Sequence, residues 1–138
     1  MRLALLTDDW HPTGGVSSYI RLVAPALARA GHEVLVLHAG PPTDEHLPGV
    51  TVTAVVGAFR RYGRRADTAA VSPVLDQLRR FRADVVHLHA NENFRLADAV
   101  RPRFPTIKTV HTLDVCPAGS KFHFATNQTC HVTTGPLC

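Results

Sequence analysis

Two hydrophobic patterns alternate along the chain. Short, nearly continuous apolar runs are typical of strands that are buried on both faces of a parallel sheet. Between them lie longer segments in which apolar residues recur every three or four positions, as on one face of a helix. The runs predict strands at residues 2–7, 33–38, 50–56, 84–89 and 106–111, and the periodic segments predict helices at residues 16–30, 68–81 and 94–100.

Glycine and proline refine the ends of these elements. Gly31 follows the last periodic position of the first helix, where a glycine commonly ends a helix. Pro25 lies inside the same helix and is expected to cost a backbone hydrogen bond or to produce a kink. In the second helix, Ser72 and Pro73 offer an alternative start, because proline is favoured at the first helical position.

The alternation of strands and helices predicts an α/β fold, a doubly wound, Rossmann-like parallel sheet with helices on both faces. Ligands of such sheets bind beyond the carboxyl ends of the strands, near the point where the strand order reverses. Functional residues are therefore expected in the segments that follow the strands, at residues 8–15, 38–40, 89–93 and 111–114.

Composition narrows the class of protein. The 138 residues are 45% hydrophobic and 19% charged, which suits one globular domain and excludes global disorder. No apolar run reaches the roughly 18 residues that suggest a membrane-spanning helix. The N-terminal run is too short for a signal peptide, so a cytoplasmic location is predicted.

The formal net charge is +4, and four arginines cluster within residues 60–65. The simplest interpretation of this cluster is a solvated loop. The alternative is contact with an acidic surface, either a phosphorylated acceptor or anionic lipid at the inner face of the membrane. Nucleic acid is not predicted as a partner, because the patch is short and contains one aromatic residue.

The first loop contains the pair Gly14-Gly15 but no G-x-G-x-x-G motif. A glycine pair before a helix lets backbone amides approach an anion or a sugar hydroxyl, although a tight turn explains the pair equally well. The second strand ends in His38 rather than in an acidic residue, which disfavours a dinucleotide-dependent oxidoreductase.

Histidines mark the ends of the last two strands. His87 and His89 alternate along the fourth strand and therefore share one face. Together with Glu92 they suggest the metal site of a hydrolase, but buried, hydrogen-bonded imidazoles at a polar strand end are the more ordinary explanation. His111 ends the fifth strand and is a candidate acid, base or hydrogen-bond donor to a ligand, or a structural histidine.

Cys116, Cys130 and Cys138 lie close together near the end of the chain. In a cytosolic protein, clustered cysteines favour a metal or free thiols over disulfides. Three cysteines and a neighbouring histidine would supply the four ligands of a structural zinc ion. The segment lacks a C-x-x-C pair, so zinc, a disulfide and free thiols all remain open.

Several of these segments resemble family 4 glycosyltransferases. Residues 7–19, with the glycine pair, resemble the opening of that family, and residues 27–37, which include G-H-E-V, resemble its continuation. D-V-V-H-L-H at 84–89 and T-V-H-T at 109–112 resemble the family's fourth and fifth strands. The tail from residue 114 resembles a cysteine-bearing loop of a subset of the family. The resemblance covers nearly the whole chain, and its motifs are specific in combination.

The resemblance implies a retaining enzyme of the two-domain GT-B arrangement. Such an enzyme moves a hexose from a nucleotide sugar to a sugar, lipid-linked or other hydroxyl acceptor, without a required metal. Gly14 and Gly15 would then approach the phosphates and the reacting sugar of the donor. His111 would contact the donor sugar and support the transition state, and Asn91 and Glu92 would face the acceptor.

By the same resemblance, residues 1–115 would form an incomplete N-terminal, acceptor-side domain, and residues 116–138 the cysteine-bearing loop. The family's C-terminal donor-binding domain, with its paired glutamates, is absent from this sequence. We therefore expect a fragment of a longer transferase that is inactive alone. A protein of a different class, a non-catalytic Rossmann-like module that binds a ligand or a partner chain, is the alternative.

Overall fold

The computed structural model describes residues 1–8, 10–55, 68–89, 93–111, 122–123 and 128–129. Its main strands are β1 (Arg2–Thr7), β2 (Glu33–His38), β3 (Val50–Ala54), β4 (Val85–His89) and β5 (Thr106–Thr109). Its helices are α1 (Gly15–Arg29), α2 (Thr68–Phe81) and α3 (Phe94–Val100). A separate antiparallel pair consists of β6 (Phe122–His123) and β7 (Gln128–Thr129).

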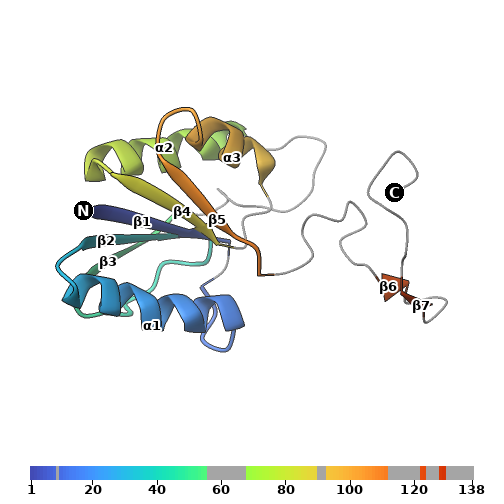
Figure 1. Ribbon diagram of the computed structural model, residues 1–138, viewed down its shortest axis with the longest axis horizontal. Coiled ribbons are helices and arrows are strands. Elements are labelled where there is room, and N and C mark those ends of the chain that lie inside the picture. Colours follow the sequence, from blue (N-terminus) through green and yellow to red (C-terminus); the bar gives the residue numbers. More distant parts are fainter. Residues whose placement is uncertain (9, 56–67, 90–92, 112–121, 124–127, 130–138) are drawn as a thin grey trace.

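The five main strands form one parallel sheet in the order β3-β2-β1-β4-β5. The chain moves outward from β1 to β2 and β3, and then returns to the other side of β1 to build β4 and β5. Helix α1 covers one face of the sheet, and α2 and α3 cover the other (Figure 1). This arrangement confirms the predicted doubly wound α/β fold and places its switch point between the carboxyl ends of β1 and β4.

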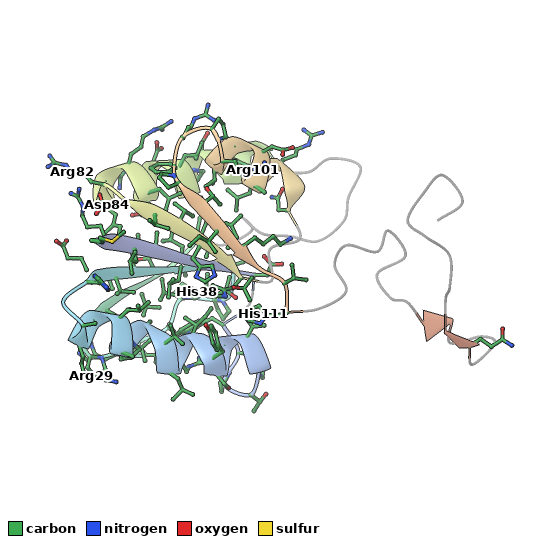
Figure 2. The ribbon with its side chains drawn as sticks, viewed as in Figure 1. Arg29, His38, Arg82, Asp84, Arg101 and His111 are labelled. Atoms are coloured by element: carbon green, nitrogen blue, oxygen red, sulfur yellow. The ribbon has the colours of Figure 1, made fainter. Side chains whose placement is uncertain are left out.

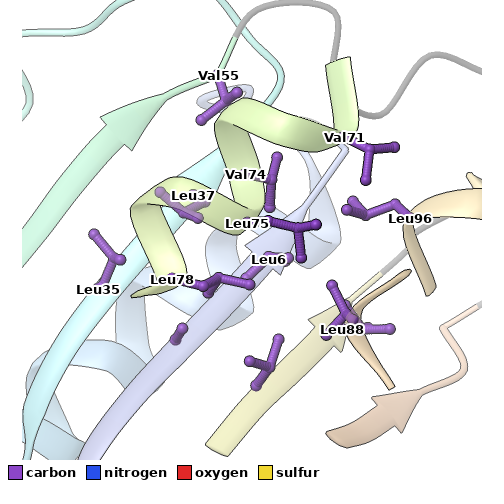
Figure 3. Packing of buried hydrophobic residues seen from close by; sticks show 13 residues of the cluster. Leu6, Leu35, Leu37, Val55, Val71, Val74, Leu75, Leu78, Leu88 and Leu96 are labelled. Atoms are coloured by element: carbon purple, nitrogen blue, oxygen red, sulfur yellow. The ribbon is translucent and has the colours of Figure 1, made fainter. Parts of the chain in front are cut away.

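The sheet separates two hydrophobic cores. Leu6 of β1 packs with Val74 and Leu78 of α2 on one face, where the three side chains are fully buried (Figure 3). Leu5 belongs to the cluster on the other face, with Ile20 of α1. Because successive residues of a strand point to opposite faces, the continuous apolar run of β1 supplies both cores.

The two edge strands, β3 and β5, end at the residues that pair with the last residues of their neighbours. Strand β3 stops at Ala54 and β5 stops at Thr109, because these residues pair with the last residues of β2 and β4, His38 and His89. The predicted ranges 50–56 and 106–111 are therefore too long. As a consequence, His111 lies just beyond the sheet rather than within a strand.

Strand β4 begins at Val85, one residue later than predicted, and Asp84 holds the start of the sheet together. The Asp84 carboxylate accepts hydrogen bonds from the backbone N–H of Arg2 at 2.7 Å and from its guanidinium at 3.1 Å. In return, the Asp84 N–H donates to the Arg2 carbonyl at 2.8 Å. These bonds join the first residue of β1 to the residue before β4, at the amino-terminal edge of the sheet.

Two prolines lie inside helices. Pro25 is buried within α1, and Pro73 lies within α2, which begins at Thr68 as predicted rather than at Ser72. Each proline lacks an N–H group, so one carbonyl in the preceding turn loses its helical partner. Packing of both helices on the sheet offsets that loss.

Helix α1 ends at the glycine that the sequence indicated. The His32 N–H donates to the Leu27 carbonyl at 3.2 Å, and the Gly31 N–H donates to the Ala28 carbonyl at 3.0 Å. Gly31 has a φ of 86°, in the left-handed region that suits glycine. These bonds form a Schellman motif, which satisfies the last carbonyls of the helix.

Helix α2 ends in the same motif, but with an arginine in the glycine position. The Ala83 N–H donates to the Leu78 carbonyl at 3.1 Å, and the Arg82 N–H donates to the Arg79 carbonyl at 3.0 Å. Arg82 has a φ of 55°. An L-residue in this region costs about 1–2 kcal/mol, so the end of α2 is strained.

Replacing Arg82 with glycine is therefore expected to stabilise the fold. Glycine removes a backbone strain of about 1–2 kcal/mol. Glycine also has more conformational freedom in the unfolded chain, which costs about 0.4–1 kcal/mol of stability. We expect a net gain of about 0.5–1 kcal/mol, measured as a higher midpoint of thermal unfolding. The matched change Gly31→Ala adds a Cβ that meets nothing within 4 Å and should destabilise through φ alone. A lower midpoint for Arg82→Gly would contradict this account.

Candidate functional site

Side chains at the carboxyl ends of the strands form one row across the sheet. The register pairs Thr7 of β1 with both His38 of β2 and His89 of β4, and pairs His89 with Thr109 of β5. Figure 2 shows His38 and His111 at this end of the sheet. The row thus lies at the edge where doubly wound sheets bind their ligands.

Two hydrogen bonds join the histidines of β4 to the neighbouring chain segment. Nδ1 of His89 lies 3.0 Å from Nε2 of His111, and Nε2 of His87 lies 2.7 Å from Oγ1 of Thr109. The ring centroids of His87 and His89 are 3.9 Å apart. Hydrogen-bonded imidazoles at a polar strand end were one interpretation of the sequence, and the geometry confirms it.

These histidines face the side of the sheet on which α1 lies. Val86 and Leu88, which alternate with them along β4, belong to the core beneath α2 and α3. His87 and His89 therefore point to the opposite face. This arrangement directs two imidazoles of β4 toward the layer that contains α1 and the loop that precedes it.

Tyr19 of α1 completes the group. Its ring centroid lies 5.7 Å from that of His89 and 5.7 Å from that of His111, edge-on to the latter. His89 is only 1% exposed, whereas Tyr19 is 42% exposed. We call His87, His89, His111 and Tyr19 the histidine cluster. It reaches from a buried strand to the surface at the carboxyl edge.

Burial keeps His89 neutral. Desolvation, first, and the nearby charges of His87 and His111 together lower its pKa to about 3. The pKa of His87 is lowered by burial and by His111. Near neutral pH, His89 is therefore an uncharged hydrogen-bonding partner for His111.

We expect the protein to lose stability in mild acid. The unfolded chain takes up a proton on His89 near its ordinary pKa of 6.5, whereas the folded protein resists protonation down to about pH 3. Stability is thus fully present above pH 6.5 and falls as the pH drops, by at most about 1.4 kcal/mol per pH unit for one such group. Urea unfolding between about pH 7.5 and pH 5 measures this slope.

Two carboxylates affect stability in a separate pH range, which is more acidic than that of the histidines. Hydrogen bonds from Arg21 lower the pKa of Glu45, and hydrogen bonds from Arg2 lower the pKa of Asp84. Their contribution is present above the unfolded carboxyl pKa of about 4 and is lost below it. Measurements above about pH 5 therefore isolate the histidines. The variant His89→Asn should flatten the profile, and an undiminished slope in that variant would exclude His89 as its source.

The loop between β1 and α1 leads to a helix whose N-cap residue makes no side-chain capping bond. Gly14 is the N-cap residue, with an extended backbone at φ −77° and ψ 135°. Its N–H donates to the His11 carbonyl at 3.3 Å, and its carbonyl accepts from the Ser18 N–H at 2.8 Å. The first turn, which starts at Gly15, contains no acidic residue. The backbone N–H groups of this turn and the helix dipole favour an anion at this position.

Arg21 of α1 holds this loop in place. Its Nε and Nη2 donate to the two carboxylate oxygens of Glu45 at 2.6 and 2.8 Å, and its Nη1 donates to the His11 carbonyl at 2.9 Å. The guanidinium carbon lies 4.3 Å from the centroid of the Trp10 ring. Trp10 in turn stacks on buried His38, with 5.5 Å between the centroids. The loop is thus anchored to both the helix and the sheet.

The structure brings some of the predicted site residues to one edge. His111 contacts His89 and Tyr19, and Gly14 and Gly15 form the start of the helix that carries Tyr19. Asn91, Glu92 and the arginine cluster at residues 60–65 lie outside the described residues, as do the cysteines, namely Cys116, Cys130 and Cys138.

Sequence reasoning missed Tyr19 and the bond between His89 and His111. Tyr19 follows Gly15 by four residues and thus lies one helical turn along the same face, which was the available signal. Asn93, from the same loop as Asn91 and Glu92, has a structural role. Its Oδ1 accepts from the Leu96 N–H at 3.2 Å and caps α3.

Within the described part of the chain, no group of three or more His, Cys, Asp or Glu side chains is arranged to hold a metal ion. His87 and His89 direct ring nitrogens at Thr109 and His111, and Glu92, the third residue of the suggested metal site, lies outside the described residues. The helices formed by described residues include none that is long and apolar enough to cross a membrane.

Comparisons with known proteins identify the family and the fold. The model of a family described as Glycosyltransferase Family 4 matches residues 13–132. Among solved structures, the chain is similar to sucrose-phosphate synthase from Thermosynechococcus elongatus, with a TM-score of 0.65 and 19% sequence identity. That match covers 92% of this chain but 37% of the other, and it supports a shared fold. No curated protein is similar to the chain at a significant level.

Proposed function

The chain belongs to glycosyltransferase family 4, and from this premise we propose that it forms the acceptor-side, N-terminal domain of a retaining glycosyltransferase. The enzyme would transfer a hexose from a nucleoside diphosphate sugar to an acceptor hydroxyl and keep the anomeric configuration. Residues 1–115 would form this domain, and residues 116–138 a cysteine-bearing loop. A separate donor-binding domain would complete the site.

One observation carries the proposal. Tyr19, one turn into the helix that begins at Gly15, lies 5.7 Å from His111 at the carboxyl edge of the sheet. The helix N-terminus and His111 therefore belong to one locality, although their residues are far apart in the sequence. A donor diphosphate and the sugar attached to it need both an anion-binding element and a nearby polar group.

The chemistry follows from charge. As the bond between the sugar and the diphosphate breaks, positive charge grows on the sugar ring and negative charge grows on the diphosphate. The backbone N–H groups that follow Gly14 and Gly15 would stabilise the departing diphosphate, and His111 would contact the sugar. Asn91 and Glu92 remain proposed contacts for the acceptor. This proposal needs no resident metal ion, and a structural zinc ion at Cys116, Cys130 and Cys138 is a separate hypothesis.

A transfer assay tests the function. The chain of 15.0 kDa is expressed alone, and in parallel the product of its source gene is identified by intact mass and expressed as found. Release of nucleoside diphosphate from UDP-glucose, GDP-mannose and related donors gives the rate, and the anomeric coupling in proton NMR spectra of the product gives the stereochemistry. We expect no turnover from the chain alone and retention of configuration by a longer product.

The outcomes separate the two classes of function. A source product of 15.0 kDa that binds a sugar but releases no nucleoside diphosphate would reject the enzyme and favour a non-catalytic binding module. An active product that inverts the anomeric configuration would reject retention.

Sedimentation with anionic liposomes at low and high salt tests peripheral membrane contact, since salt should weaken an arginine-driven interaction.

A further inference from the structure

The main chain at His111 lies outside the sheet ladder. In the described part of the chain, strands β4 and β5 pair as far as His89 and Thr109, and His111 follows the end of β5 by two residues. Side chains hold its ring instead. Nε2 of His111 lies 3.0 Å from Nδ1 of His89, and the edge of Tyr19 lies against the same ring.

The partner of His111 is fixed more firmly than His111 itself. His89 lies on β4, between β1 and β5, and is 1% exposed. Its ring lies 3.9 Å from that of His87, which is in turn 2.7 Å from the Thr109 hydroxyl. His111 is only partly buried. Support therefore runs from the buried strand β4 to the partly buried imidazole of His111.

We propose that His89 is a positioning residue that directs His111 toward the ligand, with Tyr19 restricting rotation of the ring. The hydrogen bond to His89 occupies Nε2 of His111 and leaves Nδ1 as the ring nitrogen that can meet a sugar or diphosphate oxygen. The role assigned to Nδ1 rests on the proposed function, whereas the pairing of the two histidines does not.

The pairing also determines which nitrogen of His111 carries the proton. In a bond between two neutral imidazoles, one ring donates and the other accepts. Oxygen atoms of a diphosphate and the ring oxygen of a sugar only accept hydrogen bonds, so they require a donor at Nδ1 of His111. His111 can supply it when its proton lies on Nδ1, and Nε2 must then accept from Nδ1–H of His89. We therefore assign His89 as the donor in the pair.

Nitrogen NMR of the histidine rings tests this assignment. Long-range proton–nitrogen spectra of the 138-residue chain, labelled with ¹⁵N-histidine, distinguish protonated from unprotonated ring nitrogens at a pH where both rings are neutral. We expect a protonated Nδ1 and an unprotonated Nε2 for His111. A proton on Nε2, or one averaged over both nitrogens, would overturn the proposal.

Variants then identify the cause. His89→Phe keeps a ring but removes its nitrogens, so the two His111 shifts should move toward the averaged values of a free imidazole. His89→Asn offers an amide donor in a similar position and should restore the separation of the shifts. His38→Phe is the matched control, because His38 is equally buried in the same row but stacks on Trp10. Unchanged His111 shifts in His89→Phe would also overturn the proposal.

The NMR samples contain no sugar donor or acceptor, so the result does not depend on transferase activity. If the product of the source gene has no transferase activity but the chain has the expected His111 tautomer, the proposed function is rejected and the pairing is kept. If His89→Phe does not fold, the parent spectrum still decides which nitrogen carries the proton. In an active transferase, we expect His89→Phe to lower kcat by about 10- to 100-fold with a smaller change in KM, as for a misplaced contact group.

Discussion

Replacing His111 with alanine should lower the turnover of the assembled transferase by about 100-fold or more, the usual effect of removing a positioned catalytic group. The imidazole stands at the carboxyl edge of the sheet, where His89 and Tyr19 hold it. Alanine removes the contact to the reacting sugar but leaves both supports in place. The rate of nucleoside diphosphate release at saturating donor measures the effect.

A matched histidine provides the control. His46 is exposed in the segment between β2 and β3, and its side chain belongs neither to the histidine cluster nor to the bonds between Arg21, Glu45 and His11 that hold the loop before α1. His46→Ala should therefore retain the parent turnover. Parent-like turnover in His111→Ala as well would remove His111 from the mechanism. Loss of turnover in both variants would point instead to general damage to the fold.

Replacing Leu6 with alanine should destabilise the protein by about 2–5 kcal/mol. Leu6 lies on the central strand β1, is 0% exposed and packs in the core beneath α2 (Figure 3). The smaller side chain loses buried apolar surface and leaves a cavity that a close-packed core fills poorly. Thermal or urea unfolding measures the change, which should lower the midpoint by roughly 10 °C.

The same substitution at Leu22 separates burial from residue type. Leu22 lies on α1 and is 75% exposed. Leu22→Ala should shift stability by no more than about 0.5 kcal/mol, since surface changes are usually small and alanine favours helices. Equal losses at Leu6 and Leu22 would show that burial in the sheet core is not the main source of stability at Leu6.

Hydrophobic pattern was sufficient to predict the five strands and three helices of the main sheet, because each element buries a distinct apolar face. The ends of the strands were less predictable. Val110 and His111 continue the apolar and polar pattern of β5, but neither lies in the strand, whose described pairing with β4 ends at Thr109. Pairing between distant segments, rather than local preference, determines where a strand stops.

The candidate functional site shows the same difference between features that local sequence reveals and features that depend on pairing between distant segments. The glycine pair at Gly14 and Gly15 and the strand-end position of His111 are visible in the sequence, and the family resemblance supplied their roles. The bond between His89 and His111 depends on the register of two neighbouring strands, and the contact with Tyr19 depends on where α1 crosses the sheet. Neither is encoded by spacing along the chain.

The strand order has a consequence for how the protein folds. β1 pairs with β4, whose residues lie about eighty positions later in the chain, as the register of Leu3 with Val85 shows. Closing so long a loop is slow and costs entropy before the sheet repays it. The first half of the chain can form β1, α1 and β2 early. His111, however, reaches the loop with Gly14 and Gly15 only after β4 has joined β1. The proposed site is thus assembled last, and a partly folded chain has the helix N-terminus without its histidine.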